Sequence, residues 1–145
     1  MITLLLDGTD LNFYNELLTV QPNAEALMDW TKRNRDSLSD KKGVYIISTS
    51  DDKTIYIGKA KDLYKRTMEH CKEMLPDLCT EAKRKKDVKW IDAFSPYAGQ
   101  ELELEYIPIE DELDRRWVEG KLQQMFDTVF DHGVQKMFNF SVKKH

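Results

Sequence analysis

The sequence predicts an α+β fold in which a small, mainly antiparallel sheet of three strands is flanked by helices. Two β-forming runs, residues 44–47 and 55–57, are separated by the turn-forming run 48–53, which is the pattern of a hairpin. After Gly58 the hydrophobic period changes from 2 to 3.6, and this change predicts a helix. A third strand is expected at residues 101–107, where acidic residues alternate strictly with apolar ones.

The length and composition of the chain are those of one soluble domain. It has 145 residues, of which 41% are hydrophobic and 33% are charged. No apolar run approaches the roughly 18 residues that span a bilayer, and the N-terminal apolar run lacks the preceding basic region of a secretory signal. We therefore expect a cytoplasmic protein without membrane contact. Cys71 and Cys79 have no zinc-site spacing and are expected to be reduced thiols.

Residues 1–40 are expected to form an N-terminal helical extension packed on a core domain of residues 41–145. Two short helical patterns occur in the extension, at residues 11–18 and 24–33. Asn23 is suited to cap the second of these helices. The apolar side chains of that helix would pack the extension onto the core.

The predicted hairpin brings two tyrosines together. If its centre lies between Ser50 and Asp51, Tyr45 is directly opposite Tyr56 and both phenols lie on one face. The helix that follows has a buried stripe formed by Leu63, Thr67, Cys71 and Met74.

Arg66 and His70 are four residues apart on this helix and lie together at one edge of its buried stripe. From there both side chains project toward the hairpin. The two basic side chains and the two tyrosines are therefore expected to converge on one cleft.

These residues resemble the catalytic core of the GIY-YIG endonuclease superfamily, as found in group I intron homing and phage endonucleases. Gly43-Val44-Tyr45 and Tyr56-Ile57-Gly58 are separated by ten residues and are followed by the arginine and the histidine. Val44 replaces the isoleucine of the first motif. The resemblance covers roughly residues 42–139. It implies a GIY-YIG nuclease-like fold and a metal-dependent DNA endonuclease whose products are a 5′-phosphate and a 3′-hydroxyl.

The resemblance and the chemistry of phosphodiester hydrolysis assign a role to each residue of the expected cleft. Tyr45 activates or positions the nucleophilic water, directly or through a relay with Tyr56. Arg66 binds the scissile phosphate through its planar fork, and Lys59 is a second cation that favours an ionised tyrosine. His70 orients a phosphate or relays a proton.

The last expected helix, residues 111–130, carries the candidate metal ligand. Its buried stripe is formed by Val118, Leu122, Met125 and Val129. Glu119 lies one step off this stripe, and the resemblance implies that a glutamate here binds a single Mg²⁺, for which Mn²⁺ is a possible substitute. Glu112, a heptad earlier, is the competitor. We prefer Glu119 because Glu112 already complements the dipole at the helix start.

The charge distribution favours a nucleic acid as the partner. The net charge is −4, but residues 41–90 contain 13 basic and 8 acidic residues, whereas both flanks are acidic. The densest basic run lies on a helix expected at residues 78–94 and is either a phosphate-contacting ridge or a solvated face. This run contains Lys83, Arg84, Lys85 and Lys86. An alternative role for the extension is an arm that contacts DNA through Lys32, Arg33 and Arg35.

Two further expectations concern the end of the chain and the assembly. Asn139, in a run that resembles the closing motif of the family, would organise the site or bind a backbone phosphate. DNA is the expected partner of a monomer or a weak homodimer, and a single site would nick one strand in each encounter. The alternatives to a nuclease are a non-catalytic nucleic-acid-binding module on the same fold and an acidic interaction protein.

Overall fold

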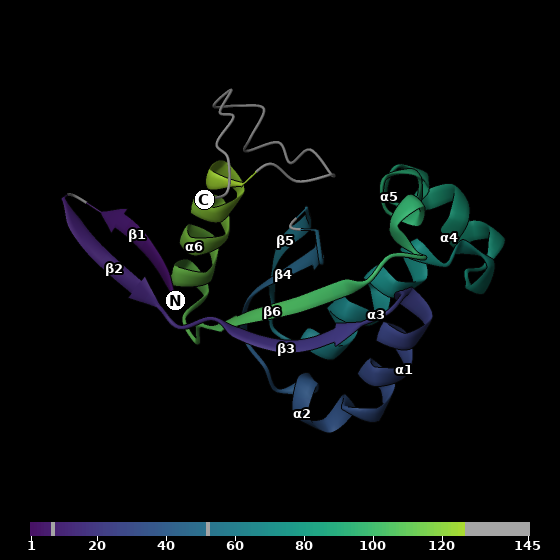
Figure 1. Cartoon of the computed structure of the whole chain (residues 1–145), viewed down its shortest axis with the longest axis horizontal. Helices are drawn as coiled ribbons and strands as arrows, with labels where there is room; N and C mark the ends of the chain where they lie inside the picture. The colour runs from purple at the N-terminus through teal and green to yellow at the C-terminus, as the bar shows by residue number, and fades with distance from the viewer. Residues whose placement is uncertain (7, 52, 127–145) are drawn as a thin grey trace.

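The computed structural model describes residues 1–6, 8–51 and 53–126. At the centre of this part of the chain lies an antiparallel sheet with the strand order β3-β6-β4-β5 (Figure 1). Its strands are β3 (Glu16–Gln21), β4 (Gly43–Thr49), β5 (Thr54–Ala60) and β6 (Leu102–Pro108). The whole of β4 is buried because helices cover both faces of the sheet. The α+β class expected from the sequence is confirmed.

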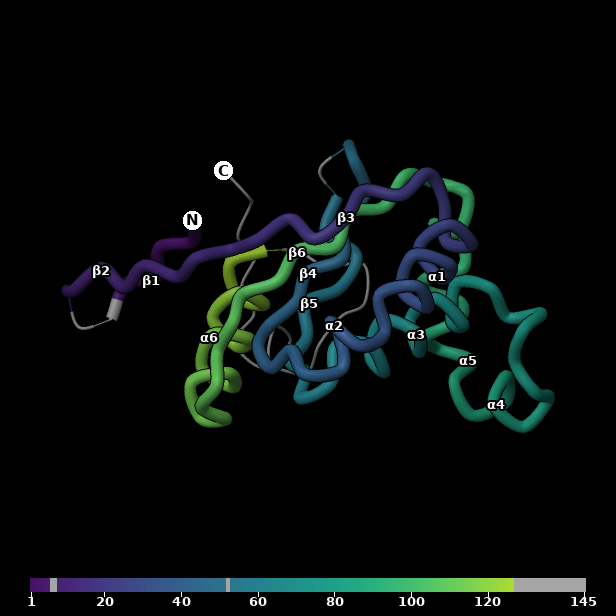
Figure 2. The backbone as a smooth tube through the Cα atoms, turned by 90° about the horizontal axis from the view of Figure 1, so that it is seen from below, coloured from purple at the N-terminus to yellow at the C-terminus, as the bar shows by residue number. Residues whose placement is uncertain are grey.

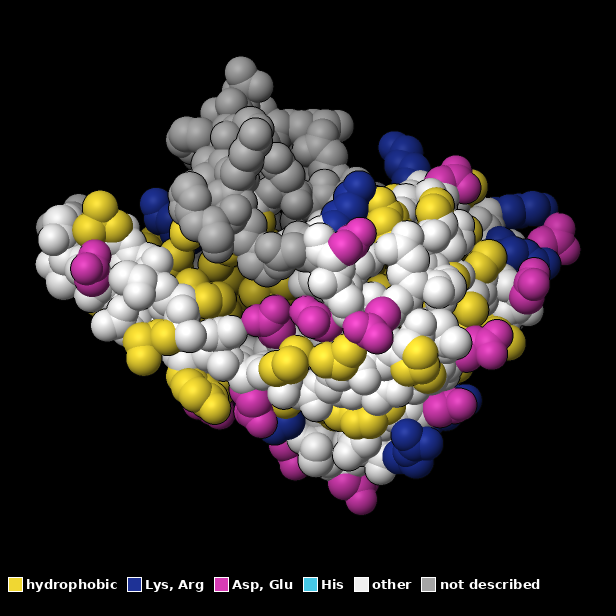
Figure 3. Space-filling model, viewed as in Figure 1, with side chains coloured by type: hydrophobic (Ala, Val, Ile, Leu, Met, Phe, Trp, Pro, Cys, Tyr) yellow, Lys and Arg dark blue, Asp and Glu magenta, His cyan; other side chains and the backbone are white. Residues whose placement is uncertain are grey.

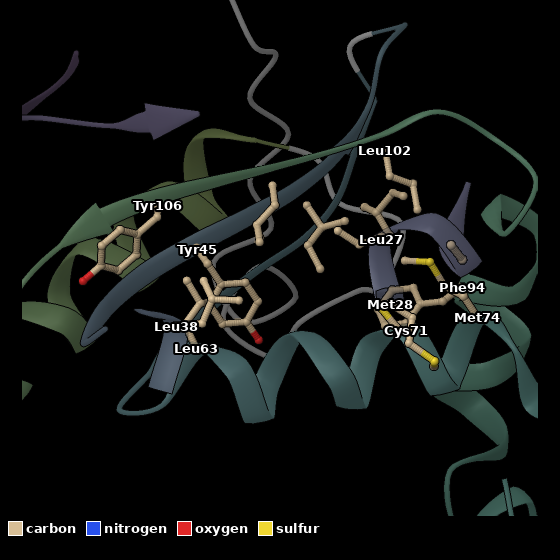
Figure 4. Close-up of a cluster of buried hydrophobic side chains, with 14 of the residues drawn as sticks. Leu27, Met28, Leu38, Tyr45, Leu63, Cys71, Met74, Phe94, Leu102 and Tyr106 are labelled. Carbon is tan, nitrogen blue, oxygen red and sulfur yellow. The ribbon is translucent and has the colours of Figure 1, made fainter. Parts of the chain in front are cut away.

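One face of the sheet is covered by helices from three parts of the chain, and Figure 2 shows the sheet between these helices and α6. Tyr45 and Ile47 of β4 point to this side and join the larger hydrophobic core. Figure 4 shows the side chain of Tyr45 directed from β4 toward α3. The covering helices are α1 (Ala24–Arg33), α2 (Arg35–Ser39), α3 (Leu63–Met74) and α5 (Val88–Phe94).

The opposite face is covered by α6 (Glu112–Met125), which packs on the alternate residues of β4, Val44 and Ile46. A separate hairpin of β1 (Ile2–Leu6) and β2 (Thr9–Phe13) lies beside α6. Its Phe13 ring is 6.3 Å from the ring of Trp117. The α6 helix is thus held between the sheet and the N-terminal hairpin.

The helix expected at residues 11–18 is wrong, because this segment forms the end of β2 and the start of β3. The backbone pairing explains the difference: β2 pairs with β1, and β3 pairs with β6 as an edge strand of the sheet. Tertiary pairing has overridden a short helical pattern. The central sheet consequently has four strands where three were expected.

The other helices agree with the sequence in part. The helix at 24–33 is confirmed, and the Asn23 side chain accepts a hydrogen bond of 2.8 Å from the amide of Ala26. The helix expected at 78–94 is divided into a 3₁₀ turn, η1 (Pro76–Leu78), the short helix α4 (Glu81–Lys86) and α5. Ile91 and Phe94 of α5 are buried in the core, whereas no residue of α4 is buried. Core packing therefore does not hold α4 and α5 together as one continuous helix. A second 3₁₀ turn, η2 (Ser95–Tyr97), follows α5.

The helical phases expected for α3 and α6 are confirmed where the structure describes them. All four stripe residues of α3 are buried, Val118 and Leu122 of α6 are fully buried, and Met125 is partly buried against the same core. The α6 helix ends at Met125, because the backbone of Phe126 is extended, and it is therefore shorter than the helix expected at residues 111–130. Val129 lies outside the described residues. No helix in the described ranges is long and apolar enough to cross a membrane.

Candidate active site

The hairpin of β4 and β5 places the two tyrosines on one face, although in a different register from the one expected. Tyr45 is paired with Gly58 and Ile47 with Tyr56, and a register shift follows Ile47 near the turn. The predicted direct pairing of Tyr45 with Tyr56 is therefore wrong by two residues. The tyrosines are diagonal neighbours instead, with ring centroids 5.9 Å apart.

The two glycines of the paired motif make room for side chains and strands that approach closely. A Cβ on Gly58 would lie 2.5 Å from Cε2 of Tyr56 and 2.7 Å from the hydroxyl oxygen of Tyr45. A Cβ on Gly43 would lie 2.0 Å from the carbonyl oxygen of Ile107. Gly58 thus allows both phenol rings to lie over the strand, and Gly43 allows β4 to approach β6.

A chain of three buried polar groups extends from β4 into α3. The hydroxyl oxygen of Tyr45 is 2.7 Å from Nε2 of His70, and Nδ1 of His70 is 2.7 Å from Oε1 of Glu73. The three residues are 1%, 5% and 7% exposed, respectively. Tyr45 and His70 were expected in the site from the sequence but Glu73 was not, although its spacing of three residues from His70 on a helix could have indicated the contact.

Aromatic rings enclose His70 on the side of β5 and α5. The ring of Tyr56 is 4.5 Å from that of His70 and 5.5 Å from that of Trp90. Phe94 completes the cluster, with its ring 5.7 Å from that of His70. Residues from β4, β5, α3 and α5 therefore meet around one imidazole.

The pKa values of both tyrosines are raised, chiefly by burial. For Tyr56 the pKa rises to about 12, and for Tyr45 it rises well above its usual value. The charge of Glu119 raises both pKa values further, whereas the charge of Arg66 lowers both. The charges of Arg66 and Glu119 thus act on the same pair of phenols.

Glu119 lies at the margin of the core, where the helical phase of α6 predicted it. Burial raises the pKa of its carboxyl group, while the charges of Lys59, Arg66 and Arg116 lower it. The backbone amide of Lys59 also donates a hydrogen bond to this carboxylate. A partly buried carboxylate thus faces the end of the YIG segment.

A cavity of about 510 Å³ opens beside these residues, at the start of α3. Its cationic lining side chains are Lys59, Lys61, Lys65, Arg66 and Arg115. Glu112 also lines the cavity and is 3.7 Å from Nζ of Lys59 and 3.8 Å from Nζ of Lys61. The competitor for the metal-ligand role is therefore an ion-pair partner of two lysines in this cavity.

The basic run of α4 does not line the cavity, and most of its side chains have partners within the protein. Lys83 is 2.7 Å from Asp87, and Lys85 is 3.3 Å from Glu81. Arg84 donates hydrogen bonds to two backbone carbonyls, and Lys86 is exposed. Figure 3 shows acidic and basic side chains interspersed at this end of the molecule.

The comparison with known protein families matches residues 41–116, just over half of the chain, to the GIY-YIG catalytic domain. The chain belongs to the GIY-YIG family. The matched residues include the hairpin, α3 and β6, whereas Glu119 lies just beyond them. A comparison with curated proteins found no match.

Among solved structures, this GIY-YIG chain is similar to two of the GIY-YIG N-terminal endonuclease domain of UvrC from Thermotoga maritima. One is an asparagine-to-alanine mutant and the other a tyrosine-to-phenylalanine mutant, each bound to its catalytic divalent cation. The sequence identities are 22% and 21%, respectively. Each alignment covers 72% of this chain and 97% of the UvrC chain, with a TM-score of 0.45.

The donor set of this GIY-YIG domain fits a cation that the protein holds through few ligands. The described part of the chain contains no group of three or more His, Cys, Asp or Glu side chains arranged to bind a metal. Glu119 is a partly buried carboxylate whose charge acts on both tyrosines, and Mg²⁺ is commonly bound through one or two carboxylates together with water and substrate phosphates. Asn139, the other residue expected to organise the site, lies outside the described residues.

Proposed function

We propose that this GIY-YIG domain is a divalent-metal-dependent DNA endonuclease that hydrolyses phosphodiester bonds to a 5′-phosphate and a 3′-hydroxyl. The proposal depends on one observation above all. Tyr45, Tyr56 and His70 form one cluster in which Arg66 and Glu119 act electrostatically on both tyrosines. A phosphate-binding cation, a metal-binding carboxylate and a proton-accepting chain are the parts that hydrolysis of a phosphodiester needs.

Tyr56 is the tyrosine that meets the nucleophilic water in this proposal. Tyr45 is only 1% exposed, whereas Tyr56 is partly exposed and its ring lies 5.9 Å from that of Tyr45. The burial of Tyr45 favours a relay over direct contact between Tyr45 and water. A proton from the water passes to Tyr56, and Tyr45 carries the chain onward to His70.

Arg66 binds the scissile phosphate. Its side chain is 53% exposed and its guanidinium is 3.4 Å from a carboxylate oxygen of Glu69, so its present ion pair is a surface pair. Such pairs contribute about 0–1 kcal/mol, and a phosphate that offers two oxygens to the planar fork would displace the carboxylate. Lys59 and Lys61 line the same cavity and would bind adjacent phosphates.

Glu119 holds the divalent cation, which would polarise the phosphate and stabilise the leaving oxygen. The Glu119 carboxylate is partly desolvated, and this is a favourable state for a ligand whose charge a cation compensates. The amide of Lys59 fixes the orientation of that carboxylate. Glu112 is less suited to hold the cation because two lysines already neutralise it.

Supercoiled plasmid DNA with Mg²⁺ tests the activity. We expect nicking that EDTA abolishes, whereas a shift of the DNA band without cutting would support a non-catalytic nucleic-acid-binding module. Glu119→Gln should abolish nicking and reduce Mg²⁺ and Mn²⁺ binding but retain DNA binding. Glu112→Gln makes the same chemical change on the same helix and should leave nicking nearly normal. An inactive Glu112→Gln protein beside an active Glu119→Gln protein would assign the metal to Glu112.

A further inference from the structure

Glu73 is a buried carboxylate that the proposed reaction does not yet use. It is 7% exposed and lies on α3, one turn beyond His70. A carboxylate this deeply buried is costly unless it accepts hydrogen bonds from a partner. The partner is Nδ1 of His70, at 2.7 Å.

This contact determines which nitrogen of a neutral His70 carries the proton. An ionised carboxylate can only accept hydrogen bonds, so Nδ1 of His70 must be the donor to Glu73. Nε2 then has a free lone pair directed at the hydroxyl of Tyr45, 2.7 Å away. The hydroxyl of Tyr45 therefore donates and Nε2 accepts, which is the direction that a proton leaving the tyrosine must take.

Aromatic side chains around His70 keep water from replacing its contacts with Tyr45 and Glu73. The ring of Tyr56 lies 4.5 Å from that of His70, and Phe94 and Trp90 of α5 enclose the imidazole from another side. A polar group enclosed in this way depends on its protein partners to satisfy its hydrogen bonds. Glu73 is thus the group that selects one tautomer of His70.

We propose that Glu73 is a positioning residue that holds His70 as the Nδ1–H tautomer, with Nε2 ready to receive the proton of Tyr45. This role rests on the proposed nuclease function. When the water oxygen bonds to phosphorus, a water proton passes to the Tyr56 hydroxyl, the Tyr56 proton passes to Tyr45, and the Tyr45 proton passes to Nε2. The carboxylate of Glu73 balances the imidazolium charge that results.

The remaining atoms of this step also balance. The bond between phosphorus and the 3′-oxygen breaks, and the departing oxygen takes a proton from solvent. After product release, the imidazolium returns its proton through the two tyrosines to solvent. Glu73 keeps its charge throughout and never contacts the DNA.

The tautomer can be measured without any assay of activity. The chain has three histidines, and the signals of His70 are those that disappear from the ¹⁵N-histidine NMR spectrum of a His70→Gln protein. We expect protonated Nδ1 and unprotonated Nε2 for His70 in the unmodified protein near neutral pH. In Glu73→Met, which keeps an unbranched side chain but removes the acceptor, the proton should move to Nε2. An Nε2–H tautomer in the unmodified protein, or no change in Glu73→Met, would overturn the assignment.

Kinetics then test the role in cleavage. Glu73→Gln keeps the shape of the side chain but removes its charge, and we expect kcat to fall roughly 10- to 100-fold with KM and DNA affinity unchanged. Glu73→Asp restores a carboxylate and should recover part of the loss. Glu25→Gln is the matched control, because Glu25 is exposed on α1. The Glu25→Gln protein should cut DNA at the normal rate. An unchanged kcat in Glu73→Gln would refute the role of Glu73, whereas absence of cleavage by the unmodified protein would refute the nuclease proposal and leave the NMR result to decide the tautomer.

Discussion

Replacing Gly58 with alanine tests whether the two tyrosines are held over β5 as the structure places them. The added methyl group would lie 2.5 Å from Cε2 of Tyr56 and 2.7 Å from the hydroxyl oxygen of Tyr45, whereas ordinary contacts begin at 3.4 Å. Tyr56 would therefore have to retreat by about 0.9 Å and the hydroxyl of Tyr45 by about 0.7 Å. The strand cannot relieve the crowding, because β5 is hydrogen-bonded to β4 along this stretch.

The cost can be worked out from the interactions that the displacement breaks. A hydroxyl now 2.7 Å from Nε2 of His70 would move beyond hydrogen-bonding distance. Crowding of a packed interior costs about 1–3 kcal/mol, and a buried polar group that loses its partner costs about 1–3 kcal/mol. We expect Gly58→Ala to lower the free energy of unfolding by about 2–6 kcal/mol, the sum of these two costs. At about 4 °C per kcal/mol for a chain of this length, Tm should fall by roughly 8–24 °C.

Thermal unfolding followed by circular dichroism measures the loss of stability, and plasmid nicking well below Tm measures the loss of site geometry in protein that is still folded. Nicking should fall by roughly 100-fold, because the proton path is broken between Tyr45 and His70. Gly120→Ala is the matched control. Among the described residues, no atom outside its own helix backbone and its two chain neighbours lies within 4 Å of the added methyl group, and alanine is favoured over glycine in a helix by up to about 1 kcal/mol. This protein should be as stable as the parent or more so.

The placement of the tyrosines would be refuted by a Gly58→Ala protein whose Tm and nicking rate match those of Gly120→Ala. A lower Tm with a normal nicking rate would support the packing of the tyrosines against Gly58 but would refute the link between the positions of the phenols and catalysis.

Three further predictions concern single groups of the site and the basic run of α4. Tyr45→Phe should reduce nicking by roughly 10²-fold or more and lower the free energy of unfolding by about 1–3 kcal/mol, because Nε2 of His70 loses its buried partner. Nicking kinetics and denaturant titration measure these two losses, and a normal nicking rate would refute the relay. Because burial raises the pKa of Glu119 above 4.5, the folded state binds the proton of this carboxyl group more tightly than the unfolded state does. Without metal, the free energy of unfolding should therefore fall as the pH rises from about 4.5 through the raised pKa. Tm measured in EDTA should show this decline in the unmodified protein and should lack it in Glu119→Gln. Three α4 lysines, Lys83, Lys85 and Lys86, can be changed to glutamate, which should weaken DNA binding whatever the DNA sequence. The slope of log K against log salt concentration should become less negative by roughly 0.9 for each phosphate that the protein no longer neutralises. An unchanged slope would place the bound DNA elsewhere on the protein.

The sequence predicted those parts of the fold whose pattern has one dominant period. The stripe of α3 and the phase of α6 follow a period of 3.6, and the structure buries the same residues. The segment 11–18 is too short for either period to dominate, and its conformation depends on pairing with β1 and β6, which lie elsewhere in the chain. The register error in the hairpin has a similar origin, because a shift beside Ile47 cannot be read from a symmetric turn.

The sequence predicted which side of a helix a site residue lies on, because this depends on spacing along the chain. It did not predict which site residues are buried, because burial depends on several elements packed together. Four residues of separation on one helix place Arg66 and His70 on the same side of α3. The same logic did not reveal that Tyr45 is enclosed, because enclosure depends on α3, α5 and both strands of the hairpin together. It therefore left direct activation of water by Tyr45 open as a mechanism, which the burial of this residue now disfavours.

Arg66 connects the two environments into which the site is divided. The chain from Tyr45 to Glu73 is buried and can hold or move a proton, but its enclosure prevents contact with DNA. The cavity at the start of α3 is open and cationic, so it can hold phosphates. Arg66 lines this cavity, and its charge lowers the pKa values of Tyr45, Tyr56 and Glu119 alike. A phosphate bound to Arg66 would therefore weaken the field that favours ionised tyrosine, unless a divalent cation on Glu119 arrived with it. In the proposed reaction, this coupling would make the site require metal and DNA together.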